Sequence, residues 1–344
     1  MPADAMNPPA PARRAVPRRR LLGVEVVLLL VFAVLPLGLG TFGITFATRM
    51  LILGVLALSF DLAWGYAGIL SFGQALFFGV AGYVVALMAT RLEIHDAVAL
   101  LGAAAFAGLV TGAAMAAIVL FGRKSPSQVF VALGTLTGSY VVDRVVRGWS
   151  FVGGQNGIPS VPQATLAGQV LEDGRVFYYA ALVVLLVVYL GLRTLVRSQF
   201  GLVLAGIRQN EARVGFLGYG TQNYKGFAFC ISGMVAGLSG GLYVLHEGFV
   251  GPGQIGPVLS TQVVLYAMFG GVGTLAGAVL GSALIEIVGL FASQYWEIGW
   301  PVVLGLLLLG VITIRPSGLV SFIVPERERK GGFGVRRPAQ EESR

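Results

Sequence analysis

Long apolar runs separated by short polar segments make up most of this chain. A run of about 20 apolar residues is long enough to cross a bilayer as a helix. Such runs predict membrane-spanning helices at about 21–40, 44–64, 68–90, 97–121, 128–148, 176–196, 226–247 and 298–314. The pattern therefore predicts an all-α polytopic membrane protein with about 8–10 transmembrane helices, some of them broken by glycine.

One further apolar stretch, about 260–291, is interrupted by the sequence "GGVGT" at 270–274. Its length of roughly 32 residues exceeds the need of one span, about 20 residues, and falls short of two, about 40. We therefore expect either a pair of short half-helices or one long, interrupted element.

A polar segment lies between the sixth and seventh predicted spans, at about 197–225. Its core, "FGLVLAGIRQNEARVGFLGYGTQNYK", predicts an amphipathic helix followed by a turn. We expect its charged side chains to stay in water and its small apolar face to pack against a partner. The residues of that face are Leu202, Ile207, Val214 and Leu217. The alternative is a helix that lies on the membrane surface.

Composition agrees with the membrane class, since 56% of the residues are hydrophobic and only 12% are charged. Soluble domains carry about 25% charged residues. The mean hydropathy is +0.81. The net charge of +8 would suggest a nucleic-acid partner in a soluble protein, but here the basic residues gather in tails and short loops. The positive-inside rule accounts for that distribution, so no nucleic-acid partner is expected.

The distribution of Lys and Arg predicts the orientation. Five lie in the N-terminal tail, two in 122–127, five in 193–225 and seven in 315–344, and a chain that starts inside places all of these segments inside. Only Arg91, Arg147 and Arg175 fall outside. This topology requires 260–291 to cross an even number of times.

The same topology divides the chain into three regions. Residues 1–20 and 326–344 are expected to be basic cytoplasmic tails, and 21–325 a single transmembrane domain whose first apolar run is a retained span rather than a secretory signal.

Two glycine-interrupted segments, 65–83 and 269–288, carry polar residues at membrane depth. Irregular backbone is tolerated there only where protein buries it or a watery cavity faces it, and transporters often place it on the substrate path. The candidate path residues are Ser71, Gly73, Gln74, Gly79, Gly271, Gly273 and Thr274. The alternative is close helix packing through small residues.

A turn-rich segment, "FVGGQNGIPSVP" at 151–162, is predicted to form an outer loop. Its candidate residues are Gly153, Gly154, Gln155, Asn156 and Gly157. It either shapes the outer mouth and contacts an external partner, or serves only as a connector.

Ionisable residues inside apolar segments are functional candidates because they are expensive to bury in a membrane. They are Glu25, Arg49, Asp61, Asp143, Arg144 and Glu286. These carboxylates are too few to suggest a proton relay. The sequence allows an ion pair between Arg49 and Glu286 but does not place the two residues together.

No motif for catalysis or nucleotide binding is present. The chain lacks the phosphate loop G-x-x-x-x-G-K-[ST], the zinc motif H-E-x-x-H and the G-x-S-x-G elbow. Its two histidines, His95 and His246, and its single Cys230 are too few and too scattered for a metal site. We expect no catalytic residue, no metal and no cofactor bound by this chain.

Several segments together resemble one known family. These are "DLAWGYAGILSFGQALFFGVAGYVVAL" (61–87), "VGGQNGIPS" (152–160), "GIRQNEARVGFLGY" (206–219), "SGGLYVLHEGFVGP" through "FGGVGTLAGAVLGSAL" (239–284) and "RPSGLV" (315–320). They look like the permease subunits of ATP-binding-cassette (ABC) importers for branched-chain amino acids, of the LivM-like subtype. Related permeases carry urea and short amides. The resemblance covers roughly 21–325.

The resemblance implies a multi-pass subunit of the bacterial inner membrane that is not itself an enzyme. It pairs with a second, homologous permease, two cytoplasmic ATPase subunits hydrolyse ATP, and a periplasmic binding protein delivers a branched-chain amino acid. Urea or a short amide is the alternative substrate. A secondary transporter acting alone is a further alternative, and would need a midplane charged site and no docking helix.

The resemblance also implies that the 197–225 loop docks on the ATPase. The docking residues carried over are Arg208, Glu211, Ala212, Arg213, Leu217 and Gly218. Many importer permeases carry E-A-A-x-x-x-G in this loop. Here Arg213 replaces the second Ala, and Gly218 follows Glu211 by seven residues rather than six, which leaves the contact geometry open.

Overall fold

The computed structural model describes residues 19–122, 126–166, 169–170 and 174–295, with a few positions between 302 and 313. Its elements are α1 (Arg19–Gly38), α2 (Thr41–Phe60), the π-helical turn η1 (Asp61–Tyr66), α3 (Gln74–Arg91), α4 (Ala97–Val119), α5 (Gln128–Gly148), the short 3₁₀ turns η2 (Ser150–Val152) and η3 (Gly154–Asn156), β1 (Thr165–Leu166), β2 (Gln169–Val170), α6 (Gly174–Arg197), α7 (Gln199–Gln209), α8 (Glu211–Phe216), α9 (Thr221–Glu247), η4 (Pro252–Gln254), α10 (Pro257–Gly270) and α11 (Leu275–Tyr295).

Seven helices among the described residues are long and apolar enough to cross a membrane. They correspond to α2 with η1, α3, α4, α5, α6, α9 and most of α11, and the apolar helix Glu25–Gly38 is shorter. The predicted all-α polytopic architecture is therefore confirmed. The exception is a small hairpin formed by β1 and β2, each of which has two residues. The predicted span 298–314 lies almost entirely outside the described residues, which accounts for part of the difference from the expected span number.

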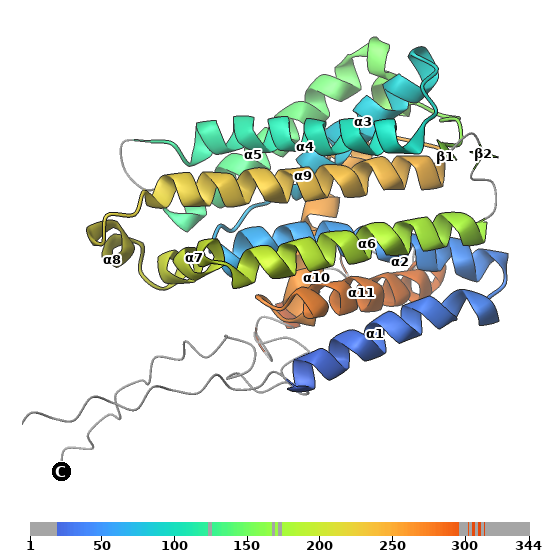
Figure 1. Cartoon of the computed structure of the whole chain (residues 1–344). Coiled ribbons are helices and arrows are strands. Elements are labelled where there is room, and N and C mark those ends of the chain that lie inside the picture. Colours follow the sequence, from blue (N-terminus) through green and yellow to red (C-terminus); the bar gives the residue numbers. More distant parts are fainter. Residues whose placement is uncertain are drawn as a thin grey trace, which may run out of the picture.

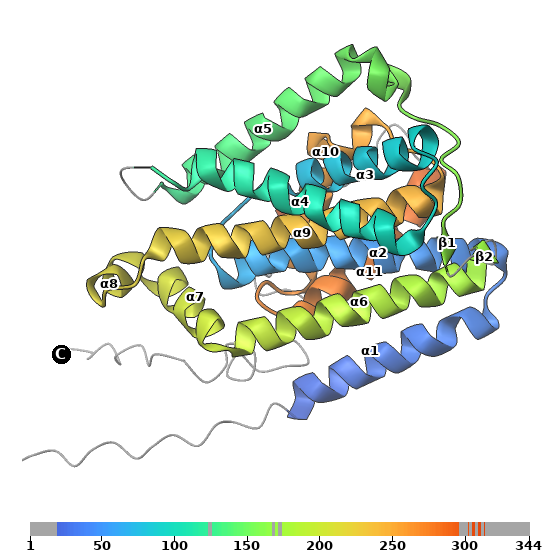
Figure 2. The same ribbon diagram turned by 45° about the horizontal axis from the view of Figure 1, so that its top comes forward.

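The long helices lie side by side and define two ends of the bundle (Figures 1 and 2). At one end, here called the α8 end, α7 and α8 lie together between α6 and α9. At the opposite end, the β1–β2 end, β1 pairs antiparallel with β2. Helix α1 lies along the edge of the bundle beside α6.

The core forms around α2 and α9. Every residue from Met50 to Phe60 of α2 is buried, because this helix is apolar on all sides and is surrounded by α6, α9 and α11. Helix α9 packs most extensively against α4. Glycines on both helices allow their backbones to approach closely.

The interrupted stretch predicted at 260–291 forms α10 and α11, with the break at 271–274. Helix α10 has 14 residues, so it is about 21 Å long and shorter than the roughly 30 Å of a bilayer core. Helix α11 is long enough to span. The stretch is therefore an interrupted element made of a short helix and a helix long enough to span, rather than a pair of short half-helices.

The break is confirmed at the glycines that suggested it. Gly271 and Gly273 have φ angles of +119° and +81°, which are left-handed conformations that side-chain-bearing residues rarely adopt. Beyond the turn, a Cβ on Gly277 would lie 2.7 Å from the carbonyl oxygen of Gly270. Helices α10 and α11 thus approach each other closely beyond the turn.

Candidate functional site

An arm of two short helices, residues 198–220, connects α6 to α9 at the α8 end (Figure 1). The sequence predicted one helix and a turn, but the arm contains α7 and α8. Asn210 separates them with extended backbone, and its side-chain oxygen accepts a hydrogen bond from the Arg213 N–H at 2.9 Å. Asn210 is therefore the N-cap of α8, a role that its side chain favours.

The outer face of the arm carries large exposed apolar side chains. Phe216 is 91% exposed and Leu217 is 72% exposed, and Tyr219 follows them on the surface. Two residues of the predicted apolar face are instead inside, since Ile207 and Val214 are buried. The reason is that α7 and α8 fold back on each other, and Val214 packs toward Gly206.

The predicted docking residues take different positions on the arm. Ala212, Arg213, Leu217 and Gly218 are exposed on and after α8. Glu211 forms an ion pair with Lys225 in the first turns of α9, which fastens α8 to that helix.

Arg208 points back toward the bundle. Its guanidinium donates a hydrogen bond to the carbonyl oxygen of Gly65 in η1. The same side chain packs against Gly68, and an added Cβ on Gly273 would lie 3.2 Å from its Nη1. Arg208 thus joins the arm to the transmembrane helices.

The two glycine-interrupted segments meet at this place. The Asp61 carboxylate, fully buried, accepts a hydrogen bond from the backbone N–H of Gly273 at 2.6 Å. A Cβ on Gly273 would lie 3.3 Å from the Gly65 oxygen. Thr274 is buried beside them and donates to the Gly271 carbonyl. Segments about 200 residues apart in sequence therefore form one polar contact.

The other candidate path residues lie where α3 begins. Gln74 is buried, accepts a hydrogen bond from Ser59 at 3.1 Å, and donates to Ser232 at 3.1 Å. Ser71 is also buried, and its hydroxyl accepts a hydrogen bond from the Gly73 N–H. These contacts link α2, α3 and α9 through polar groups inside the bundle.

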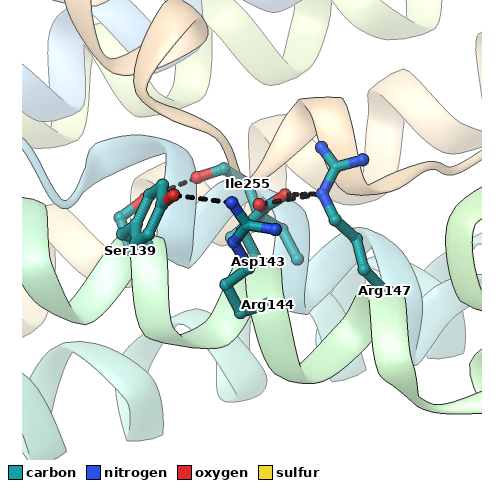
Figure 3. A network of polar contacts seen from close by, with 6 residues as sticks. Ser139, Asp143, Arg144, Arg147 and Ile255 are labelled. Carbon is teal, nitrogen blue, oxygen red and sulfur yellow. Dashed lines mark hydrogen bonds and ion pairs between the residues drawn. The ribbon is translucent and has the colours of Figure 1, made fainter.

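The segment 248–256 enters the middle of the bundle between α3 and α5. Gly79 of α3 leaves room for Ile255, whose carbonyl accepts a hydrogen bond from the Ser139 hydroxyl of α5 (Figure 3). One helical turn further along α5, Asp143 pairs with Arg147 at 2.9 Å (Figure 3). The start of α10 is thereby attached to two spanning helices.

The predicted outer loop is at the β1–β2 end. Gly153, Gly154 and Gly157 have positive φ angles, and Gln155 and Asn156 are exposed. Ile158 forms a β-bridge with Val250, so the loop is hydrogen-bonded to the segment that leads into α10.

Four of the six ionisable residues inside the apolar segments form ion pairs, namely Glu25, Arg49, Asp143 and Glu286. Arg49 lies 3.4 Å from Glu286 and 4.0 Å from Glu247. The Tyr266 hydroxyl donates to Glu286 at 2.5 Å. The ion pair that the sequence only allowed is therefore present, and it ties α2, α9, α10 and α11 together. Glu25 of α1 forms an ion pair with Arg193 of α6.

Sequence reasoning missed Ser139, Ser232 and Tyr266. No motif or spacing distinguishes them from the other polar residues of their helices, and only the fold reveals their partners. Among the described residues, no group of three or more His, Cys, Asp or Glu side chains is placed to hold a metal ion.

Comparison with known proteins identifies the family. Residues 43–314 match the family described as "Branched-chain amino acid transport system / permease component". The LivM permease protein of the high-affinity branched-chain amino acid transport system of Escherichia coli K12 is 28% identical over 231 residues, which cover 59% of this chain and 53% of that protein. Its Salmonella typhimurium counterpart is 28% identical over 255 residues, 66% of this chain and 58% of that protein.

A different transport system also provides relatives. The Autoinducer 2 import system permease protein LsrC of Enterobacter sp. strain 638 is 32% identical over 142 residues, 38% of this chain and 40% of that protein. No solved structure matches. The chain spans little more than half the length of the LivM relatives it matches. Because the family match covers most of the chain, the protein is a multi-pass membrane protein that belongs to the permease components of the branched-chain amino acid transport family.

Proposed function

We propose that this chain is the membrane-spanning subunit of an ATP-driven importer, and that cytoplasmic ATPase subunits dock on the arm at α8. The observation that carries this proposal is the exposure of Phe216 and Leu217 on a short, capped helix at one end of the bundle. Large apolar side chains surrounded by charged neighbours mark a surface that a partner covers. A secondary transporter acting alone has no use for such an arm.

The proposed assembly contains a second homologous permease, two ATPase subunits and a periplasmic binding protein, and lies in the bacterial inner membrane. ATP is hydrolysed by the ATPase subunits, since this chain carries no phosphate loop. The basic residues of 193–225 and of both tails support a cytoplasmic position for the arm and the termini.

The transport path is proposed to run between the break before α3 and the short helix α10. Backbone breaks of this kind line substrate paths in many transporters. Ser71, Gly73, Gln74 and Gly79 belong to the first element, and 271–274 ends the second. Ser71, Gly73, Gln74 and Gly79 are buried in this structure, so ATP-driven movement of the arm is proposed to separate α3 from α10 and open the path.

The outer loop is proposed to receive the binding protein. Gln155 and Asn156 are exposed there, and the Ile158–Val250 bridge connects the loop to the start of α10. Contact with a loaded binding protein is thereby coupled to the segment proposed to move.

Branched-chain amino acids are the proposed substrates, on the strength of the family and of the LivM relatives. The mostly apolar environment of α3 and α10 suits such side chains better than it suits an ion. The LsrC relatives make autoinducer 2 a second cargo to test, and urea is a third. Uptake of labelled leucine by the reconstituted assembly, in competition with each of the others, distinguishes them.

The docking proposal is tested with a double variant, Phe216→Ser with Leu217→Ser. Both side chains are exposed, so we expect the permease's own stability to change by less than about 0.5 kcal/mol. Loss of an apolar anchor at an interface weakens binding by about 2 kcal/mol. We therefore expect weaker co-purification with the ATPase subunits and slower ATP-driven uptake.

The matched control is Leu166→Ser, which removes an exposed leucine at the β1–β2 end. It should leave ATPase association unchanged. Full ATPase association in the double variant would show that the arm is not the docking site, and uptake by the chain without ATPase subunits would favour the stand-alone transporter.

A further inference from the structure

Three parts of the chain converge on a small group of residues at the α8 end. This group, here called the junction, consists of Asp61, Gly65, Arg208 and Gly273. Arg208 comes from the arm, Asp61 and Gly65 come from the π-helical end of the α2 span, and Gly273 comes from the turn between α10 and α11. Two hydrogen bonds connect them, from Arg208 to the Gly65 carbonyl and from the Gly273 N–H to Asp61.

One polar atom in the junction is left without a partner. Asp61 is fully buried, and its Oδ1 accepts from Gly273, whereas its Oδ2 has no hydrogen-bond partner among the described residues. A buried carboxylate oxygen without a partner is costly, so it favours any arrangement that supplies a donor. Arg208 carries five N–H donors, and it is hydrogen-bonded to Gly65, where an added Cβ would overlap Asp61 Oδ1.

We propose that Arg208 is a positioning residue that transmits movement of α8 to the α10–α11 turn by exchanging its hydrogen bond between the Gly65 carbonyl and Asp61 Oδ2. This inference rests on the proposed function, because it assumes that an ATPase moves α8. Arg208 precedes the cap residue Asn210 by two positions, so displacement of α8 displaces Arg208 as well. The exchange gives the junction two discrete arrangements, which energetic coupling between sites requires.

The surroundings of the junction permit such an exchange. A π-helical turn has an irregular hydrogen-bond ladder and often marks a functional site. The turn between α10 and α11, to which the movement is transmitted, contains Gly271 and Gly273 with positive φ angles. It follows the end of the short helix α10. A different attachment of α8, the Glu211–Lys225 ion pair, leads only to α9, which is packed closely against α4.

The test uses the complete assembly with its ATPase subunits and binding protein in proteoliposomes. Arg208→Gln and Asp61→Asn each remove one charge, and Asn retains an oxygen that accepts from the Gly273 N–H. Loss of one coupling contact changes the coupled process by roughly five- to 150-fold. We expect uptake to fall within that range while ATP hydrolysis is preserved, so that more ATP is consumed per substrate molecule transported.

Two further variants separate positioning from simple destabilisation. Arg208→Lys retains the charge and should recover part of the uptake. Arg144→Gln removes an exposed arginine that is hydrogen-bonded to Tyr140 on its own helix, α5, and should leave the ratio of ATP to substrate unchanged. A purely structural defect would lower uptake and hydrolysis together, and that result would contradict the inference.

The remaining outcomes also decide between the inference and its alternatives. If the wild type is active and the ratio of ATP to substrate is unchanged in both Arg208→Gln and Asp61→Asn, the role of the junction is overturned. The proposed function would not be affected by that result. Loss of ATPase co-purification in Arg208→Gln would place Arg208 in the docking surface instead. If Arg208→Gln does not yield a folded permease at all, Arg208→Lys and Asp61→Asn provide the same comparison. A wild-type assembly without ATP-driven uptake would contradict the proposed function and the inference that rests on it.

Discussion

The interface between α4 and α9 and the junction at the α8 end are built on opposite principles. In the first, two G-x-x-x-G patterns face each other, with Gly108 and Gly112 on α4 and Gly233 and Gly237 on α9. A Cβ on Gly108 would lie 2.8 Å from the Gly237 Cα, so the contact is backbone against backbone. The junction instead rests on two hydrogen bonds and leaves one buried oxygen unpaired.

The difference separates a fixed part of the molecule from a part that is able to rearrange. Backbone packing through small residues has no alternative geometry, because helices that are already in contact cannot move closer. In the proposed exchange, the Arg208 hydrogen bond moves between two acceptors, the Gly65 carbonyl and Asp61 Oδ2, so the junction has two arrangements. We infer that the α4–α9 interface is the scaffold and that α10, with its turn, is the moving element.

The largest expected effect comes from a substitution in the scaffold. Gly108→Val places two methyl groups against the α9 backbone, and overpacking of this kind costs about 1–3 kcal/mol, occasionally more. We expect a lower melting temperature and a smaller yield of monodisperse protein, measured by thermal unfolding and size-exclusion chromatography in detergent. Gly102→Val is the control, because Gly102 lies on the same helix and a Cβ added there meets nothing within 4 Å. Equal stability of the two variants would contradict the scaffold role.

A second expected effect concerns a polar cluster whose groups are paired. Glu286 is 7% exposed and contacts both Arg49 and the Tyr266 hydroxyl. Glu286→Ala leaves those partners without their acceptor, so we expect a loss of about 1–3 kcal/mol in unfolding free energy.

The control for Glu286 is Glu247→Ala. Glu247 shares Arg49 as its partner but lies 4.0 Å away and is more exposed. Exposed pairs contribute about 0–1 kcal/mol, so thermal unfolding of this variant should change little. The comparison would fail if Glu247→Ala proved the more damaging of the two.

The smallest effect on stability is expected at the junction. Gly273→Ala puts a side chain on a residue with a φ angle of +81°, at a cost of about 1–2 kcal/mol. The folded protein should persist, but the new methyl group crowds Arg208 and Gly65, so ATP-driven uptake should fall more than thermal stability does. Gly253→Ala, where a Cβ meets nothing within 4 Å, is the control. Unimpaired uptake in Gly273→Ala would argue against movement at this turn.

Much of the fold could be predicted from the sequence, because apolar length identifies spanning helices directly. The break at 270–274 followed from its glycines, and the sparse charges drew attention to Arg49 and Glu286. The division of the arm into α7 and α8 was missed, although Asn210 is a favourable N-cap followed by Glu211.

The candidate site was less predictable, because side-chain direction in a short helix depends on tertiary contacts. Ile207 and Val214 looked suited to a partner, yet they are buried inside the arm, and Phe216 is exposed instead. Arg208 remains a predicted docking residue, and sequence reasoning did not foresee its contact with Gly65, 143 positions away in sequence. Periodicity places a residue on a face of a helix but does not identify what covers that face.

The most direct test of the central claim is site-specific photocrosslinking from position 216 in the membrane. A photoreactive amino acid replaces Phe216 in one variant and Leu166 at the opposite end in another, each expressed with the proposed ATPase subunits. The account predicts a crosslink from position 216 to an ATPase subunit and none from position 166. Crosslinking from position 216 to lipid alone would mean that α8 lies on the membrane surface, and would contradict the docking role of the arm.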